Sequence, residues 1–135
     1  MVETVVPSRP VTASVITHLG SLGFGVGDGQ APDPSTFPYS VVYSLDAVER
    51  SGPMNDGQAD VVHTQQVTVV GETQEQAQKL LDKVRVKMRD ETLTIADREV
   101  SLIEVDEGDG VERDGREQPP LFYAIDVYMI TTTPE

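Results

Sequence analysis

One feature of this sequence limits the possible folds more than any other. It is a strand-like run that ends in glycine and passes directly into an amphipathic helix. Residues 60–70 are rich in Val and Thr and alternate weakly, which predicts a strand in the middle of a sheet. Gly71 ends this strand, and Thr73 with Gln76 three residues later matches a capping box. The apolar residues that follow at helical spacing are Ala77, Leu80, Leu81, Val84 and Met88. The segment predicts a helix that covers one face of a sheet.

The rest of the chain predicts a further helix and further strands for the same two layers, one of helices and one of sheet. An apolar stripe predicts a helix over residues 9–21, and the glycine-rich residues 23–34 predict a short strand at best, followed by an irregular loop. Further strands are predicted at 39–45, 92–95, 100–105 and 121–132, with a loop at 46–60 and a polar turn at 96–99. With 135 residues there is room for one domain. We therefore predict an α+β fold in which two helices pack on one mainly antiparallel sheet of four to five strands.

Composition excludes several classes of protein. The 10 Lys and Arg against 23 Asp and Glu give a formal net charge of −13, which argues against general binding to a phosphate backbone. The absence of cysteine excludes thiol nucleophiles, disulfides and Cys-ligated metals, and it fits synthesis in a reducing compartment. Neither a signal-peptide pattern nor an apolar stretch of about 18 residues occurs, so we expect neither secretion nor a membrane span.

Motifs for catalysis and for cofactors are weak. His18 and His63 are the two histidines, and their places in a predicted helix and a predicted strand favour structural roles. The glycines at 23–29 lack the third glycine of a dinucleotide-binding fingerprint. A calcium-binding loop that began at Asp106 would need side-chain oxygen ligands at positions 108 and 110, and both of these residues are glycine. We therefore predict no cofactor and no metal. Acid–base chemistry would have to use one of these histidines or a carboxylate with a raised pKa, and a site formed by His63 with a nearby carboxylate stays open as an alternative.

Charge is distributed unevenly along the chain. Five of the ten basic residues lie in the second predicted helix: Lys79, Lys83, Arg85, Lys87 and Arg89. Residues 104–118 contain almost nothing apolar and are predicted to form a mobile solvent loop, with acidic residues at Glu104, Asp106, Glu107, Asp109, Glu112, Asp114 and Glu117. Two interpretations of the basic stripe are open. It is a solvated helix face, or it meets an acidic surface such as this loop on the next copy, in a head-to-tail contact that can close into a ring.

Three stretches, in this order along the chain, carry a family resemblance. The weaker one is the opening helix and loop followed by Pro38–Tyr43 (PYSVVY). The central one is DVVHTQQVTVVGETQEQAQ at 60–78, continuing with Leu80, Leu81, Val84 and Arg85. The third is PLFYAIDVY at 120–128, followed by TTTP at 131–134. Together they resemble the tail terminator, or tail completion, proteins of bacteriophages with long non-contractile tails, particularly those that infect actinobacteria. The acidic loop and the glycine series are not part of this resemblance.

The resemblance implies a single domain over residues 1–135 that is a structural virion protein and not an enzyme. Such a protein is made in the host cytoplasm and forms a hexameric ring at the head-proximal end of the tail tube, where it ends tube polymerisation and docks the head. Its partners would be other copies, the tail tube protein and a neck protein, while DNA passes through the lumen without specific binding. We add two hypotheses: the acidic loop faces the lumen or the neck, and the basic stripe lies at a subunit or tube contact. The alternatives are a head-completion or neck connector protein, and a small ligand-binding or hydrolytic domain that uses His63.

Overall fold

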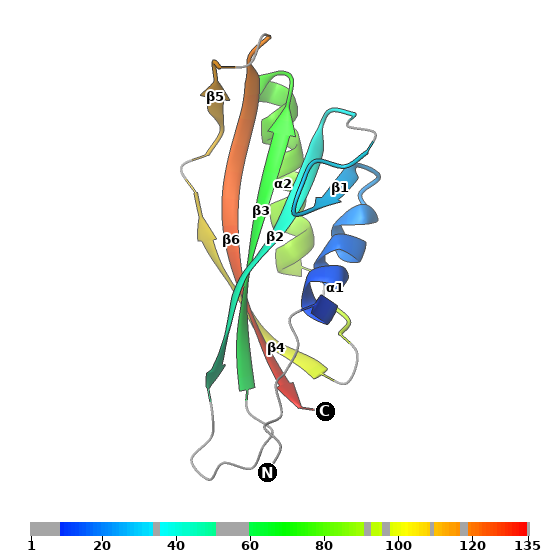
Figure 1. The fold of residues 1–135 in the computed structure, drawn as a ribbon, viewed down its shortest axis with the longest axis vertical. Helices are drawn as coiled ribbons and strands as arrows, with labels where there is room; N and C mark the ends of the chain where they lie inside the picture. The colour runs from blue at the N-terminus through cyan, green and yellow to red at the C-terminus, as the bar shows by residue number, and fades with distance from the viewer. Residues whose placement is uncertain are drawn as a thin grey trace.

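The structure, a computed structural model, describes residues 9–33, 36–50, 60–90, 93–95, 98–108, 110–116 and 119–134. Within this part of the chain, two helices and six strands follow in the order α1 (Arg9–Gly20), β1 (Gly25–Asp28), β2 (Tyr39–Arg50), β3 (Asp60–Gly71), α2 (Gln74–Asp90), β4 (Arg98–Glu107), β5 (Glu112–Asp114) and β6 (Leu121–Pro134). The strands form one long twisted sheet, and both helices pack against the same side of it (Figure 1). The prediction of an α+β fold with two helices on one sheet is confirmed for these residues.

The sheet is larger than predicted, and it is mixed. Its strand order is β1-β2-β3-β6-β4, and β5 pairs with β6 next to the end of β4. Strand β1 runs parallel to β2, with Gly25 opposite Tyr39, whereas every other pair of named strands is antiparallel. The direction of this pairing depends on where the chain re-enters the sheet at Tyr39, and the glycine-rich segment contains no local signal for that.

Strand β4 confirms one of two short strands that the sequence predicts and is longer than expected. The strand predicted at 100–105 lies within β4, which covers Arg98–Glu107. The other was predicted at 92–95, and the described residues 93–95 form no named strand, while residues 92, 96 and 97 lie outside the described residues. Ile95 makes an isolated bridge to Arg98 and belongs to no named strand. The continuous strand forms because β6 provides an antiparallel backbone partner along its whole length.

The acidic segment is only partly a loop. Residues 104–107 complete β4, and Glu112–Asp114 form β5, so the prediction of a solvent loop over 104–118 is wrong for these residues. Pairing with β6 overrides the loop-like composition, since it satisfies backbone groups whatever the side chains are. Acidic side chains are well suited to β4 because it is an edge strand, where charge opposes pairing with other molecules.

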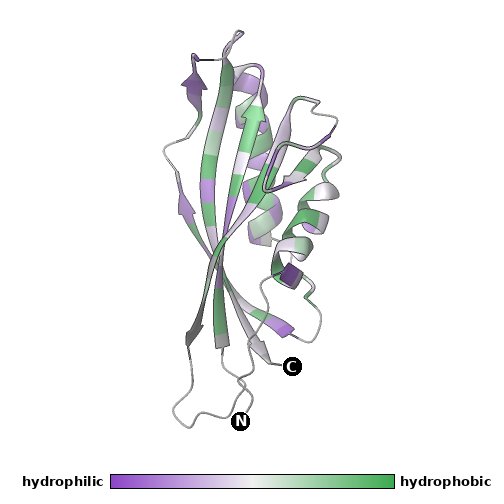
Figure 2. Cartoon of the chain, viewed as in Figure 1, coloured by the Kyte–Doolittle hydropathy of each residue, from purple (hydrophilic) through white to green (hydrophobic). Residues whose placement is uncertain are grey.

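The core lies between the helices and the sheet face that they cover. The predicted helical stripe is confirmed, because Ala77, Leu80, Leu81, Val84 and Met88 are all buried. They pack with Val11, Val15 and Leu19 of α1 and with Val42, Val67, Val69, Ala124, Tyr128 and Ile130 of the sheet. Figure 2 shows polar bands between apolar ones along β6. Burial, and not hydropathy, distinguishes its two faces, because Ala124, Asp126, Tyr128 and Ile130 are buried whereas Ile125 between them is 38% exposed. Within the described residues, neither helix is long and apolar enough to cross a membrane.

The junction between β3 and α2 explains the glycine that ends the strand. Thr73 Oγ1 accepts a hydrogen bond from Gln76 N at 3.1 Å, which confirms the predicted N-cap. Gln76 Oε1 accepts from Glu72 N at 2.7 Å, one residue before the usual capping-box partner. A Cβ atom on Gly71 would lie 2.8 Å from Ala77 N, so only glycine allows the strand to approach the helix this closely.

Candidate interaction surfaces

A buried ion pair joins α2 to the centre of the sheet. Arg85 Nε donates to Asp126 Oδ2 at 2.8 Å, and Arg85 Nη2 donates to Asp126 Oδ1 at 2.9 Å. The Asp126 side chain is 1% exposed and that of Arg85 is 22% exposed. Such a two-point contact between a guanidinium and a carboxylate is both strong and geometrically specific. Arg85 therefore points toward the sheet and is not part of a solvent-facing stripe.

Other groups complete this cluster around Asp126. Gly108 N donates to Asp126 Oδ1 at 3.1 Å, and the Tyr128 hydroxyl donates to Asp126 Oδ2 at 3.4 Å. Glu107 lies 3.1 Å from Arg85 Nη1 and 3.8 Å from Arg89 Nη2. The hydrogen bond to Asp126 raises the pKa of Arg85, and burial raises the pKa of Tyr128. Both shifts move away from neutrality, so neither group exchanges a proton near pH 7.

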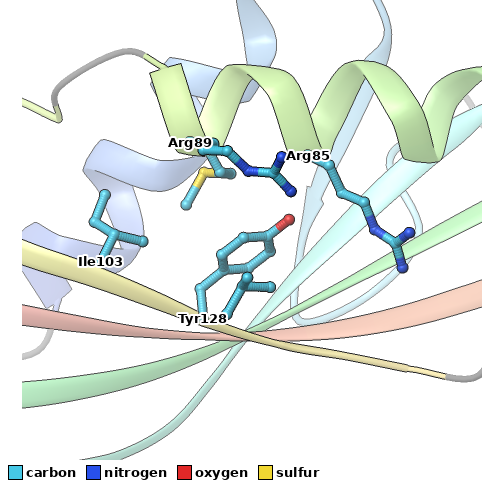
Figure 3. Close-up of a pocket in the computed structure, with 6 residues that line it drawn as sticks. Arg85, Arg89, Ile103 and Tyr128 are labelled. Atoms are coloured by element: carbon cyan, nitrogen blue, oxygen red, sulfur yellow. The ribbon is translucent and has the colours of Figure 1, made fainter.

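A small hollow lies beside this cluster. Arg85, Met88 and Arg89 of α2 line it from one side, and Ile103, Val105 and Tyr128 line it from the sheet. Figure 3 shows Tyr128 pointing toward α2, with the end of Arg89 next to its hydroxyl, Arg85 extending away on one side and Ile103 on the other. The cavity volume is about 30 Å³, which is the volume of about one water molecule. This hollow is too small for a substrate.

The structure therefore places the residues of the predicted basic stripe in different environments. Arg85 and Arg89 bind Glu107 of the same chain, so part of the contact that was expected between copies is made within one subunit. Lys79 and Lys83 remain on the outer side of α2. Lys79 Nζ lies 2.9 Å from Glu75 in an exposed pair, and Lys83 Nζ lies 4.9 Å from the centre of the Phe24 ring.

Lys87 lies at the contact between the two helices. Its backbone carbonyl is 2.9 Å from His18 Nε2. This hydrogen bond connects α1 to α2 and gives His18 the structural role that the sequence predicts.

A larger hollow lies between the acidic segment and β6. It has a volume of about 230 Å³, and it is lined by Asp106, Glu107, Gly108, Gly110, Glu112, Tyr123, Ile125 and Val127. Three of the seven predicted acidic residues thus surround one apolar floor. Of the others, Glu104 is exposed on β4, Asp114 pairs with Arg116 at 3.2 Å, and Asp109 and Glu117 lie outside the described residues. In the described part of the chain, no group of three or more acidic or histidine side chains is arranged to hold a metal ion.

Comparison with known proteins adds information on the fold. No protein-family model matches the sequence, and no curated protein matches it. A solved structure described as "Virion of native gene transfer agent (GTA) particle" contains a chain that matches with a TM-score of 0.67 at 16% sequence identity. The two chains share one fold. The match covers 93% of this chain and 95% of that chain, so it includes both helices and the sheet and is not limited to one motif.

His63 lies in a setting that does not suit catalysis. Its side chain is fully buried on β3, and neither ring nitrogen has a hydrogen-bond partner in the described part of the chain. Burial lowers the pKa of His63, and the nearby Arg98 lowers it further. His63 lines neither of the two hollows. The charged group that acts on it is a guanidinium and not the carboxylate that the hydrolytic alternative requires, so the geometry does not favour that alternative.

Replacing His63 by leucine is expected to reduce the loss of stability in acid. Because the native pKa is lowered, the unfolded chain binds a proton at this histidine at a higher pH than the native chain does. The stability that depends on neutral His63 is therefore present above the unfolded pKa of about 6.5 and is lost as the pH falls below it. Urea midpoints at about pH 7.5 and about pH 5.5 measure this dependence. Equal pH dependence in the wild type and in His63→Leu would contradict it.

The sequence analysis missed Asp126 as a site residue. A signal for it was present, because Asp126 falls among Ala124, Tyr128 and Ile130 on the core-facing side of a predicted strand. A carboxylate in such a position needs a buried partner. The identity of that partner was not available from spacing, since Arg85 lies 41 residues away in the chain.

Proposed function

We propose that this chain is a structural protein of a tailed, phage-like virion, and that it forms a ring at the head-proximal end of the tail tube. There it ends tube growth and provides the surface to which the head or neck attaches. The observation that carries the proposal is the whole-length match in fold to a chain of the gene transfer agent virion. The match covers 93% of this chain and 95% of the other, so the likeness extends over the described fold as a whole.

The sequence resemblance supports the tail terminator role in particular. Two of its stretches coincide with β3, the start of α2 and the first part of β6. These elements lie next to each other, because β3 pairs with β6 and α2 contributes to the core above them. The resemblance thus concerns the centre of the fold and not scattered surface segments.

The charge of the chain suits this role. A strongly acidic subunit would line a passage through which DNA slides without adhering, because both surfaces are negative. In the proposed ring, the acidic segment from Glu104 to Glu117 faces the lumen or the neck, close to where one subunit meets the next.

The test is the mass of the purified protein by light scattering behind size exclusion, followed by electron microscopy after mixing with the tail tube protein of the same virion. The proposal expects rings of about six copies, or tubes that stop growing and carry a ring at one end. A protein that is monomeric alone and that leaves tube growth unchanged would overturn it. Rings that bind heads but not tubes would move the assignment to a head-completion or neck connector protein.

A further inference from the structure

The acidic residues at the rim of the larger hollow differ in whether they have an ion-pair or hydrogen-bond partner. Glu107 is held by Arg85 and Arg89, and Glu112 accepts a hydrogen bond from Tyr123, which raises the pKa of that tyrosine. Asp106 is exposed and has no ion-pair partner among the described residues. The rim therefore presents one unneutralised carboxylate on β4 and a second one that is fixed in place above the floor.

The floor of the same hollow is apolar and open. Ile125 is 38% exposed, and Tyr123 and Val127 on either side of it are half-buried. A volume of about 230 Å³ is below the range of about 300–1,000 Å³ that is typical of small-molecule sites. The size of the hollow suits a few side chains of a partner protein better than a free ligand. Because its rim is acidic and its floor is apolar, the complementary surface would carry a cation beside an apolar side chain.

The outer face of α2 carries such a pair. Lys79, Lys83 and Val86 recur at helical spacing on this face, and Val86 is 57% exposed. The exposed pair between Lys79 and Glu75 holds Lys79 only weakly. Arg85 and Arg89, in contrast, are engaged within the subunit. In a chain of net charge −13, this face of α2 is where cations and an exposed apolar residue occur together.

We infer that the hollow lined by Asp106, Glu112 and Ile125 receives the Lys79–Lys83–Val86 face of α2 from a second copy of this chain. This inference rests on the proposed function, because it names the contact between neighbouring subunits of the ring. The two surfaces are different parts of the molecule, so the contact is head-to-tail, and repetition around an axis closes it into a ring. Opposite charge at the rim sets the register, and Val86 against Ile125 excludes water from the centre.

A charge swap tests this contact. Lys83→Glu alone and Asp106→Lys alone should each weaken assembly about tenfold or more, because each places like charges opposite one another. The double variant Lys83→Glu with Asp106→Lys should restore assembly toward the wild type. The measurement is the concentration dependence of the mass by light scattering, with the urea midpoint of each variant taken to show that it folds. Arg9→Glu makes the same change in net charge as Lys83→Glu, at an exposed site on α1, and should assemble as the wild type does.

The outcomes separate this contact from the ring itself. Normal rings formed by Lys83→Glu would overturn the contact and leave the proposed function in place. Single variants that weaken assembly without recovery in the double variant would also overturn the contact, because the two residues would then act on different partners. Loss of tube capping by Asp106→Lys, with its rings intact, would show that the hollow serves a basic surface of another virion protein, and would likewise overturn the inference.

Discussion

Asp126→Ala is expected to lower the free energy of unfolding by about 3 kcal/mol, the lower end of the range for breaking a buried ion pair. Removal of this carboxylate leaves three donors without their acceptor: the Arg85 guanidinium, Gly108 N and the Tyr128 hydroxyl. The loss stays at the lower end because Glu107 still lies 3.1 Å from Arg85 and keeps part of its charge paired. Urea unfolding monitored by circular dichroism measures the change.

Two further variants show whether burial is the cause. Glu75→Ala removes a carboxylate whose partner Lys79 is equally exposed, and it should leave the urea midpoint unchanged. The double variant Arg85→Met with Asp126→Leu should recover most of the stability, because apolar groups of similar volume can replace a buried ion pair at little cost. If Asp126→Ala unfolds at the same urea concentration as Glu75→Ala, the carboxylate is not the buried acceptor described here.

The same cluster positions the proposed contact between subunits. Asp126 holds Gly108 N, and Arg85 holds Glu107, so the wall of the acidic hollow is attached to α2 and to β6 at two adjacent residues. Asp106 precedes this wall directly in β4. A rim that is fixed before assembly loses less conformational entropy on binding than a mobile loop would. The buried pair therefore contributes to stability and also shapes the surface that the next copy would meet.

Local pattern was sufficient for the elements whose side chains decide their structure. The spacing of Leu80, Val84 and Met88 predicted the buried face of α2, and the alternating run at 121–132 predicted the strand β6. The run of Val and Thr at 60–70 was correctly placed in the middle of the sheet, where β3 lies between β2 and β6. In each case burial on one face imposes a period that can be counted along the chain.

Long-range pairing accounts for what the sequence did not predict. Residues 104–107 have the composition of a loop, yet they continue β4 because β6 lies beside them. The parallel pairing of β1 with β2 has no local signature either. The partner of Arg85 is decided by the distance between α2 and β6 in space, so five basic residues that form one cluster along the sequence serve different purposes in the fold.

Gly108→Ala is expected to lower the free energy of unfolding by about 2 to 3 kcal/mol. A Cβ atom at this position would lie 2.0 Å from the carbonyl oxygen of Ile125, which belongs to the backbone of β6. Strand β6 is paired on both of its sides and cannot retreat, so the end of β4 must move instead. That movement pulls Gly108 N away from Asp126 and widens the acidic hollow. The loss should thus appear both in the urea midpoint and as weaker self-association.

Gly115→Ala is the matched control in the same segment. A Cβ atom there would have Arg113 Nη1 as its nearest neighbour, at 3.8 Å, which is ordinary van der Waals contact. The two variants make the same chemical change seven residues apart, so any difference between them comes from the close approach to β6 and not from the lost flexibility of glycine. If both variants keep the stability and the association of the wild type, then β4 ends without pressing against Ile125, and the rim of the hollow is not held in place by the fold.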